Sequence, residues 1–308
     1  MSKGIRISDA GLETWLIFQR GRELRDFSAF ELLRDPGGRA LLREYYQGFV
    51  ELAAQQGLGL VLETPTWRAS PDWGRRLGWS DEDLAAINAE AAAFVDAIRR
   101  EAPSPETITV SGNIGPRGDG YVAGEAMSVE EAQSFHAFQI EVFAQSRVDR
   151  VAAFTMTNVA EATGIVLAAG ECDIPCVIAF TLETDGRLPS GERLGEAIET
   201  MDASRLTRPD HYMINCAHPD HFASTIEPGA AWANRIHGVR ANASRLSHEE
   251  LDACDTLDDG DPRELATLTR NLAGRLPNLS LLGGCCGTDH RHVALMGEAF
   301  LASKETTT

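Results

Sequence analysis

The sequence predicts an α/β fold, a single (β/α)8 TIM barrel. Eight short β-rich segments recur along the 308 residues, and amphipathic helical stretches separate them. Most of the eight segments are near-continuous apolar runs, as expected of parallel strands that are covered on both faces. The length also fits, because such barrels usually contain ~250 residues. We therefore expect one barrel over residues 1–303 and a disordered tail at residues 304–308.

The eight expected strands are placed by their apolar residues and by the glycines and polar residues around them. They occupy residues 4–11, 57–65, 107–115, 150–157, 175–182, 211–218, 235–243 and 279–287. An open doubly wound sheet is the competing arrangement. It is disfavoured because no G-x-G-x-x-G motif follows the first segment.

Helices are predicted between these strands by capping residues and helical periodicity. Ser80 precedes an acidic first turn in the stretch 80–102, and Ser128 stands three positions before Glu131, the spacing of a capping box. Residues 247–257 and 262–276 supply further helix before the last strand. His290 and His292 are expected to begin the last helix.

Composition excludes several classes of partner. The formal net charge is −18, and such an acidic surface repels the phosphates of nucleic acids. The same charge mildly favours a small cationic substrate. No apolar run approaches the ~20 residues that span a bilayer, and the first residues lack the apolar region of a secretory signal. We therefore expect a cytoplasmic protein that binds neither nucleic acid nor membrane, with its six cysteines reduced.

Catalytic groups of such barrels come from the carboxyl ends of several strands. Polar and aromatic residues gather where the expected strands end, and nine of them are candidate substrate-binding residues. They are Asp9, Gly11, Glu13, Glu63, Trp67, Ser111, Thr155, Asn215 and Asn242.

Three cysteines belong to the same strand ends. Cys216 follows the sixth strand, and Cys285 and Cys286 follow the eighth, one neighbour away around the barrel. Consecutive side chains of a regular strand point to opposite faces, but the flanking glycines of the Gly-Gly-Cys-Cys-Gly run allow an irregular backbone that turns both sulfurs inward. Three thiolates with one vacant position describe a catalytic zinc site. Buried packing is the alternative for each cysteine, and spacing leaves both open.

Other chemistries fit the sequence less well. Cys172, Cys176 and Cys254 are expected to be packing residues. A Cys/His zinc site that uses His218 and His221 would leave the adjacent cysteine pair without a role. A barrel lyase or aldolase that forms a Schiff base is excluded, because the chain has few lysines, and Lys3 and Lys304 among them lie near the termini. A purely structural zinc would need a fourth protein ligand.

Six motifs together resemble the zinc-dependent homocysteine S-methyltransferase family, which includes betaine– and S-methylmethionine–homocysteine methyltransferases. They are "DAGLET", "ETPTWRAS", "SGNIGP", "FTLETDGRLPSG", "MINCAHP" and "LLGGCCG", spread along nearly the whole chain. The resemblance implies a (β/α)8 barrel in which Cys216, Cys285 and Cys286 hold Zn²⁺ and the acceptor thiol takes the open position. It also implies that Asp9 lies close to the acceptor.

The implied reaction moves a methyl group from a small onium donor to a thiol, homocysteine in the family, to give methionine. The donor would be S-methylmethionine, S-adenosylmethionine or a betaine, and Trp67 offers an indole face for its positive charge. A different thiol acceptor remains the alternative.

One departure from the family pattern concerns the acceptor. The family usually has Glu-Thr after strand four, where the glutamate helps hold the amino group of homocysteine. This chain has Phe154 and Thr155 there, with Glu161 in the expected place downstream. Either Glu63, Glu13 or Glu183 replaces the missing carboxylate, or the acceptor is not homocysteine.

Overall fold

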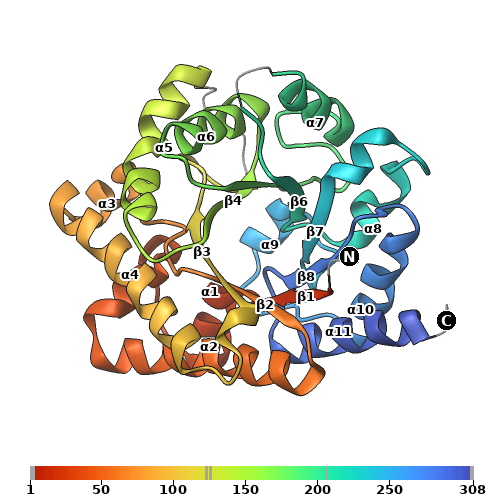
Figure 1. The fold of residues 1–308 in the computed structure, drawn as a ribbon, viewed down its shortest axis with the longest axis horizontal. Coiled ribbons are helices and arrows are strands. Elements are labelled where there is room, and N and C mark those ends of the chain that lie inside the picture. The colour runs from red at the N-terminus through yellow and green to blue at the C-terminus, as the bar shows by residue number, and fades with distance from the viewer. Residues whose placement is uncertain (1–3, 122–123, 125–126, 205–206, 306–308) are drawn as a thin grey trace.

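A closed barrel of eight parallel strands forms the centre of the molecule (Figure 1). The computed structural model describes residues 4–121, 124, 127–204 and 207–305. The strands are β1 (Arg6–Ser8), β2 (Gly59–Glu63), β3 (Ile108–Ile114), β4 (Arg150–Met156), β5 (Cys176–Phe180), β6 (His211–Asn215), β7 (Ile236–Ala241) and β8 (Leu281–Gly284). They pair in chain order, and β8 pairs with β1 to close the ring. The predicted fold is confirmed, and each predicted range contains one strand.

Helices surround the barrel and connect successive strands. They are α1 (Leu12–Thr14), α2 (Pro36–Gln56), α3 (Pro71–Leu77), α4 (Asp81–Glu101), α5 (Val129–Ala144), α6 (Val159–Glu171), α7 (Leu194–Asp202), α8 (Pro219–Phe222), α9 (His248–Asp252), α10 (Pro262–Asn271) and α11 (His290–Glu305). The predicted tail overlaps the end of α11, and residues 306–308 lie outside the described residues.

The predicted helix starts are confirmed at two places. The side chain of Ser80 accepts a hydrogen bond from the backbone of Asp83, and Ser128 and Glu131 form a reciprocal capping box. One expectation is wrong in detail, since Cys254 lies just beyond the short helix α9. Helix α2, which the sequence analysis does not predict, begins at an aspartate N-cap with proline in its first turn.

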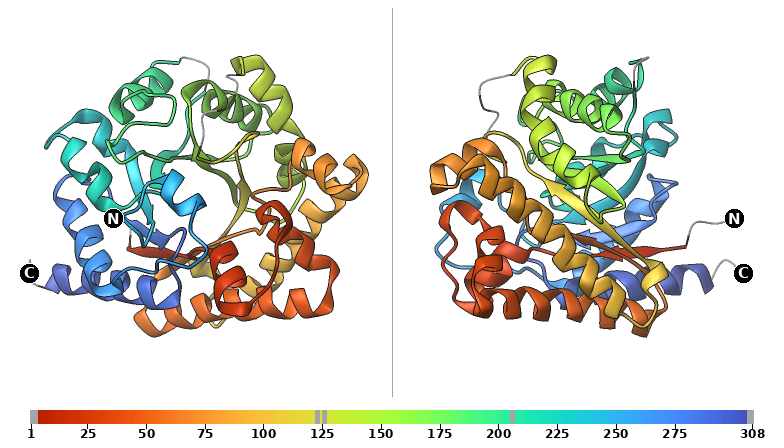
Figure 2. Two further views of the ribbon diagram at one scale, coloured as in Figure 1. Left: turned by 180° about the vertical axis from the view of Figure 1, so that it is seen from behind. Right: turned by 60° about the vertical axis from the view of Figure 1, so that its left-hand side comes forward.

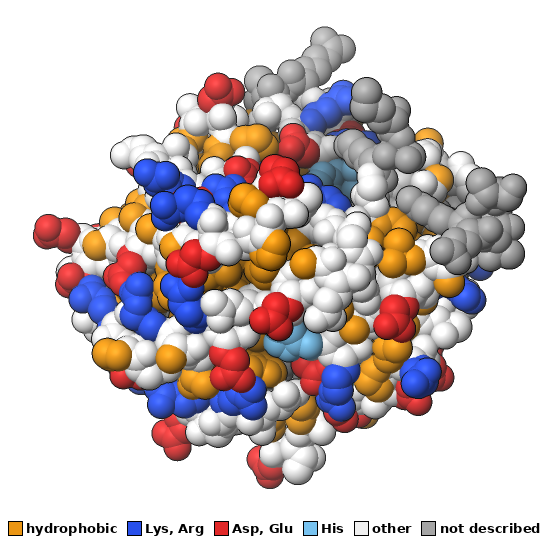
Figure 3. Space-filling model, turned by 60° about the horizontal axis from the view of Figure 1, so that its bottom comes forward, with side chains coloured by type: hydrophobic (Ala, Val, Ile, Leu, Met, Phe, Trp, Pro, Cys, Tyr) orange, Lys and Arg blue, Asp and Glu red, His pale blue; other side chains and the backbone are white. Residues whose placement is uncertain are grey.

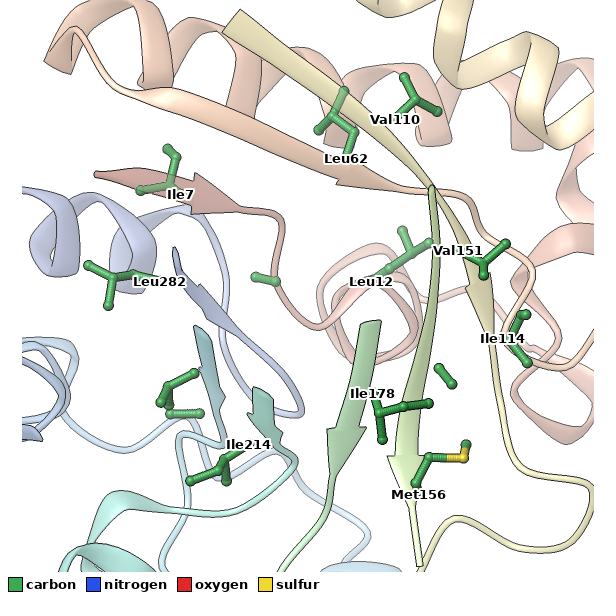
Figure 4. Close-up of a cluster of buried hydrophobic side chains, with 14 of the residues drawn as sticks. Ile7, Leu12, Leu62, Val110, Ile114, Val151, Met156, Ile178, Ile214 and Leu282 are labelled. Atoms are coloured by element: carbon green, nitrogen blue, oxygen red, sulfur yellow. The ribbon is translucent and has the colours of Figure 1, made fainter. Parts of the chain in front are cut away.

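Apolar side chains of β2, β4, β5, β6 and β8 alternate between two clusters, one on each face of the sheet. Outward residues such as Leu62, Ile178 and Leu282 pack beneath the helices, and Figure 4 shows them around the sheet. A second cluster fills part of the barrel interior, and it includes Val61 and Phe154. The core therefore leaves the carboxyl ends of the strands as the place for polar groups.

The loops at the carboxyl ends of the strands form one face of the molecule. Helices α1 and α9, which follow β1 and β7, lie on this side and come forward when the molecule is viewed from behind (Figure 2, left). Acidic and basic side chains are interspersed over the face that Figure 3 shows. Within the described residues, no helix has the length and apolar character needed to cross a membrane.

Candidate active site and metal centre

Cys216, Cys285 and Cys286 meet at the carboxyl ends of β6 and β8. Their sulfur atoms all lie within 4.8 Å of one another, and the Cys216 and Cys286 sulfurs are 3.8 Å apart. Cys216 is buried, and the other two are half-buried. The ends of two strands that are far apart in the sequence therefore bring three thiol groups together.

Local backbone geometry turns these sulfurs toward one point. Cys216 follows β6 with φ of 52°, a left-handed backbone conformation that costs free energy for a residue other than glycine. Cys285 and Cys286 follow the last residue of β8, so the strict alternation of a strand no longer applies. Gly287 then takes φ of 78°, which favours glycine. A Cβ at Gly284 would collide with the side chain of Thr288, so close packing requires that glycine.

A disulfide joins Cys216 and Cys285 in this structure, which departs from the expectation of six reduced cysteines. The backbone permits this bond, because the Cα atoms of the two cysteines are 5.4 Å apart, within the usual range for disulfides. Reduction of this one bond gives three thiols at the same place.

The donor set fits a zinc ion once the thiols are reduced. A tetrahedral zinc with Zn–S bonds of about 2.3 Å keeps its sulfur ligands about 3.8 Å apart, as Cys216 and Cys286 already are. Among the described residues, no further His, Cys, Asp or Glu joins the three cysteines. Three soft ligands beside a pocket match the arrangement of a catalytic rather than a structural zinc site.

A pocket opens beside the cysteines and contains part of the predicted site. Five of the nine candidate substrate-binding residues line it: Gly11, Glu13, Trp67, Thr155 and Asn215. The Asn215 side chain is held by Thr155, whose backbone N–H donates to Asn215 Oδ1 at 2.9 Å, while Asn215 Nδ2 donates to Thr155 Oγ1 at 3.0 Å. The Asn215 amide also lies 3.9 Å from the Cys285 sulfur. This pair joins β4 and β6 beside the cysteines.

The other four candidates are buried away from the pocket lining: Asp9, Glu63, Ser111 and Asn242. Glu63 and Ser111 are paired in register on neighbouring strands and lie inside the barrel, where Arg150 is 3.8 Å from the Glu63 carboxylate. Burial raises the pKa of Glu63, and the nearby arginines oppose that rise. Each predicted range contains a strand, but Glu63 and Ser111 lie deeper in the barrel than the pocket lining.

Arg240 is the largest omission from the sequence-based site. It lies on β7, is 7% exposed and lines the pocket. Its guanidinium pairs with Asp9 at 2.6 Å and donates to the backbone oxygens of Ala10 and Gly284 at 3.1 and 3.0 Å. Arg240 therefore links the ends of β1, β7 and β8, and its contact on β8 is with the residue directly before Cys285. A single arginine within a strand gives no sequence signal for this role.

Phe154 lies where the family pattern has its glutamate, and its ring lines the pocket at 4.8 Å from the Arg240 guanidinium. Of the three proposed replacements, Glu63 is buried inside the barrel and Glu183 pairs with His248 at 3.2 Å. Only Glu13 of the three lines the pocket. Burial raises its pKa to about 7, and the nearby charge of Asp9 adds to the rise.

Glu161, the downstream residue of the family pattern, belongs to a neighbouring structural network. Its carboxylate contacts the buried His136 ring at 2.9 Å and accepts the backbone N–H of Arg117 at 2.7 Å. It does not appear among the described residues that line the cysteine pocket.

The aromatic residues of the pocket differ in how much of each ring is available. Arg68 lies between Trp67 and Trp73, with its guanidinium 4.0 and 3.8 Å from the two ring centroids, so it covers one face of Trp67. Phe27, in the loop after α1, also lines the pocket and is 44% exposed. Asp26 and Phe27 both have positive φ. Phe27 is not predictable from the sequence, because a lone phenylalanine in a loop carries no signal.

The remaining pocket residues that the sequence analysis does not select come mainly from the loops after β1 and β3. They are Ala10, Thr14, Asn113, Asp119, Gly120 and Tyr121. A closed barrel whose pocket lies at the carboxyl ends of its strands, with three cysteines at one point in that pocket, has the arrangement of a (β/α)8 enzyme with a cysteine cluster in its active site.

The chain belongs to the homocysteine S-methyltransferase family, because the sequence model of that family, described as Homocysteine S-methyltransferase, matches residues 6–300. It is therefore a methyltransferase. Homocysteine S-methyltransferase 1 of Brassica oleracea var. italica is 25% identical over 310 residues, which cover 92% of this chain and 90% of the relative. The Arabidopsis thaliana protein of the same name is 24% identical over the same shares.

Solved structures show the same fold. The homocysteine methyltransferase MmuM from Escherichia coli in its metallated form superposes with a TM-score of 0.74 and 20% identity, and the match covers 96% of each chain. The oxidized form of the same protein superposes with a TM-score of 0.73 and 19% identity over the same shares.

Proposed function

We propose that this methyltransferase uses zinc to transfer a methyl group from a small onium donor to homocysteine, giving methionine. The observation that carries the proposal is the convergence of Cys216, Cys285 and Cys286 beside a pocket, with no fourth His, Cys, Asp or Glu joining them among the described residues. An open ligand position next to a substrate pocket suits catalysis, whereas a structural site normally has four protein ligands.

These three cysteines would hold the ion. Bound zinc would supply the thiolate form of the acceptor, since a coordinating thiol is deprotonated. The acceptor sulfur then attacks the methyl carbon of the donor, a new S–CH₃ bond forms, and the bond from that carbon to the cationic sulfur or nitrogen breaks. The donor sulfur or nitrogen becomes uncharged as it leaves and the proton of the acceptor thiol passes to solvent, so the leaving group needs no general acid.

Glu13 is our proposed partner for the ammonium of homocysteine. It is the glutamate that lines the pocket among the three that were candidates to replace the missing carboxylate. Phe154 cannot balance an ammonium, and the Arg240 guanidinium beside it repels one. The ammonium is therefore expected on the Glu13 side of the pocket. Asp9 is proposed as a support for Arg240 rather than as a direct acceptor contact.

The donor is proposed to place its positive charge against aromatic rings at the pocket mouth. Phe27 offers an exposed ring there, and a cation over an aromatic face gains about 0.5–2 kcal/mol. Trp67 contributes through the part of its ring that Arg68 does not cover. S-methylmethionine, S-adenosylmethionine and betaines all satisfy this requirement. The net charge of −18 supports a cationic donor in a general way.

A second acceptor class is favoured by one observation, the replacement of the family's glutamate by Phe154. A thiol without an amino group would find a neutral ring and the Arg240 guanidinium at that place. The two acceptor classes differ in one expectation: methylation of homocysteine should depend on Glu13, whereas methylation of a thiol without an amino group should not.

The test is a matrix of acceptors and donors with reduced, zinc-loaded protein. Homocysteine, its analogue without the amino group and its analogue without the carboxylate are each combined with S-methylmethionine, S-adenosylmethionine and a betaine. The proposal expects the highest kcat/KM with homocysteine and one onium donor. Faster methylation of the amino-free thiol would mean that the acceptor belongs to the second class and is not homocysteine. Absence of methylation with every thiol would overturn the proposed function.

A further inference from the structure

We propose that Tyr121 is a positioning residue of the cysteine cluster. Its hydroxyl donates a hydrogen bond to the sulfur of Cys286, and His248 holds its ring in place. The inference rests on the proposed metal site, and it assigns a role to two residues from loops on opposite sides of the barrel mouth.

The hydroxyl of Tyr121 is directed at the sulfur atoms. It lies 3.1 Å from the Cys286 sulfur and 3.9 Å from the Cys216 sulfur. Tyr121 reaches this position from the loop after β3, whereas the cysteines follow β6 and β8. A phenolic hydroxyl is a donor as well as an acceptor, and a thiolate sulfur only accepts. In the reduced cluster, we therefore assign the hydroxyl as the donor and the thiolate sulfur as the acceptor of this contact.

His248 fixes the ring that carries this hydroxyl. The two rings are stacked with centroids 4.2 Å apart and an angle of 15° between their planes. His248 is buried at the start of α9, where Ser247 and Glu250 form a capping box. Its Nε2 lies 2.8 Å from the backbone oxygen of Cys216, and its Nδ1 contacts Glu183. The histidine thus links the tyrosine to the backbone of a second cysteine.

The chemical consequence concerns the charge on the sulfur ligands. Three thiolates in one place concentrate negative charge, and a hydrogen bond to one of them disperses part of that charge and fixes the direction of its lone pairs. Partners that hydrogen-bond to metal ligands commonly change metal affinity or activity by 10–100-fold when they are removed. Tyr121 and His248 together would set the orientation of Cys286 toward the ion and toward the acceptor.

The experiment removes the hydroxyl and retains the ring. Zinc affinity of reduced wild-type protein and Tyr121→Phe is measured by competition with a chromophoric chelator, and the cobalt-loaded proteins are compared by their thiolate-to-cobalt absorption. Tyr212→Phe is the matched control, because it also removes one hydroxyl hydrogen bond, to Asp202, outside the pocket. We expect Tyr121→Phe to bind zinc about 10-fold or more weakly and to shift the cobalt absorption, while the control leaves both unchanged.

The results distinguish this inference from the proposed function. Unchanged zinc affinity and cobalt absorption in Tyr121→Phe would overturn the role of Tyr121 and leave the metal site intact. Failure of the reduced wild-type protein to bind either metal would instead overturn the metal site. Tyr121→Leu, which loses both the hydroxyl and the ring, serves if the phenylalanine variant is unstable, and wild-type metal binding by that variant would likewise contradict the inference.

Discussion

At the residue scale, the pocket contains a departure from the family pattern and a residue that we propose compensates for it. Phe154 lies where the family pattern has a carboxylate, and Glu13 lines the same pocket from α1. The sequence alone offered three glutamates for this role. Position decides among them, because Glu63 is inside the barrel and Glu183 is paired with His248.

We predict that Glu13→Gln lowers kcat/KM for homocysteine by about 10- to 100-fold, because a hydrogen bond to a charged group contributes about 1.5–3 kcal/mol. The rate with the amino-free thiol should stay close to that of the wild type. Steady-state kinetics with both thiols measure the difference, and Glu23→Gln on the exposed surface is the control. Equal losses for the two thiols would remove Glu13 as the ammonium partner.

The same residue predicts a pH dependence. Burial raises the pKa of Glu13 to about 7, so its carboxylate becomes neutral as the pH falls below that value. A neutral carboxyl holds an ammonium more weakly, and the KM for homocysteine should rise as the pH drops through about 7. A pH profile tests this against Glu13→Gln, in which the acidic limb should be absent. An identical limb in the variant would assign the titration to another group.

Phe27 leads to a prediction about the donor. Phe27→Ala should raise the donor KM by about 2- to 30-fold, the equivalent of 0.5–2 kcal/mol, and leave the acceptor KM nearly unchanged. Because the ring is 44% exposed, the melting temperature should change little. Trp67→Ala is the comparison, and it should also lower the melting temperature, since Trp67 stacks with Arg68. An unchanged donor KM in Phe27→Ala would place the donor elsewhere.

At the scale of elements, the ends of β1, β7 and β8 are joined by Arg240. Its bonds to Gly284 and Ala10 fix the backbone that leads into Cys285, and its charge balances the buried Asp9. The Gly-Gly-Cys-Cys-Gly segment therefore depends on a side chain from a neighbouring strand as well as on its own glycines.

We predict that Arg240→Met lowers the free energy of unfolding by about 3–5 kcal/mol, because it leaves the Asp9 carboxylate buried without its partner. Denaturant unfolding measures this loss. Arg235→Met, which breaks a more exposed pair with Asp202, should cost about 1 kcal/mol or less. Similar losses in the two variants would contradict the proposed support role.

The elements were more predictable from the sequence than the site was. Apolar runs and capping residues such as Ser80 and Ser128 act locally, so they located the strands and two long helices. Tyr121 and His248 are distant in sequence and meet only because the barrel closes. The four candidates that are buried show the same limit, since the sequence does not give the depth of a strand-end side chain in the barrel.

At the scale of the whole molecule, barrel closure brings the cysteines together, and the core does not depend on them. The strands pack through apolar residues on both faces of the sheet, and Figure 4 shows part of the outer cluster. The metal would therefore act on the reaction more than on the fold.

Removal of zinc by a chelator from reduced protein should abolish methyl transfer and leave the circular dichroism spectrum of the folded barrel in place. Readdition of zinc should restore the activity. Cys216→Ala should remain inactive after the same treatment. Collapse of the secondary structure on chelation would mean that zinc is structural.

The most direct test of the account is the number of sulfur atoms bound to zinc in the reduced protein, measured by X-ray absorption at the zinc edge. We predict one zinc per chain with three sulfurs at about 2.3 Å, from Cys216, Cys285 and Cys286, and a fourth sulfur when homocysteine is added. Two sulfurs after Cys286→Ala would support the assignment further. A full set of four protein ligands that homocysteine leaves unchanged would contradict it.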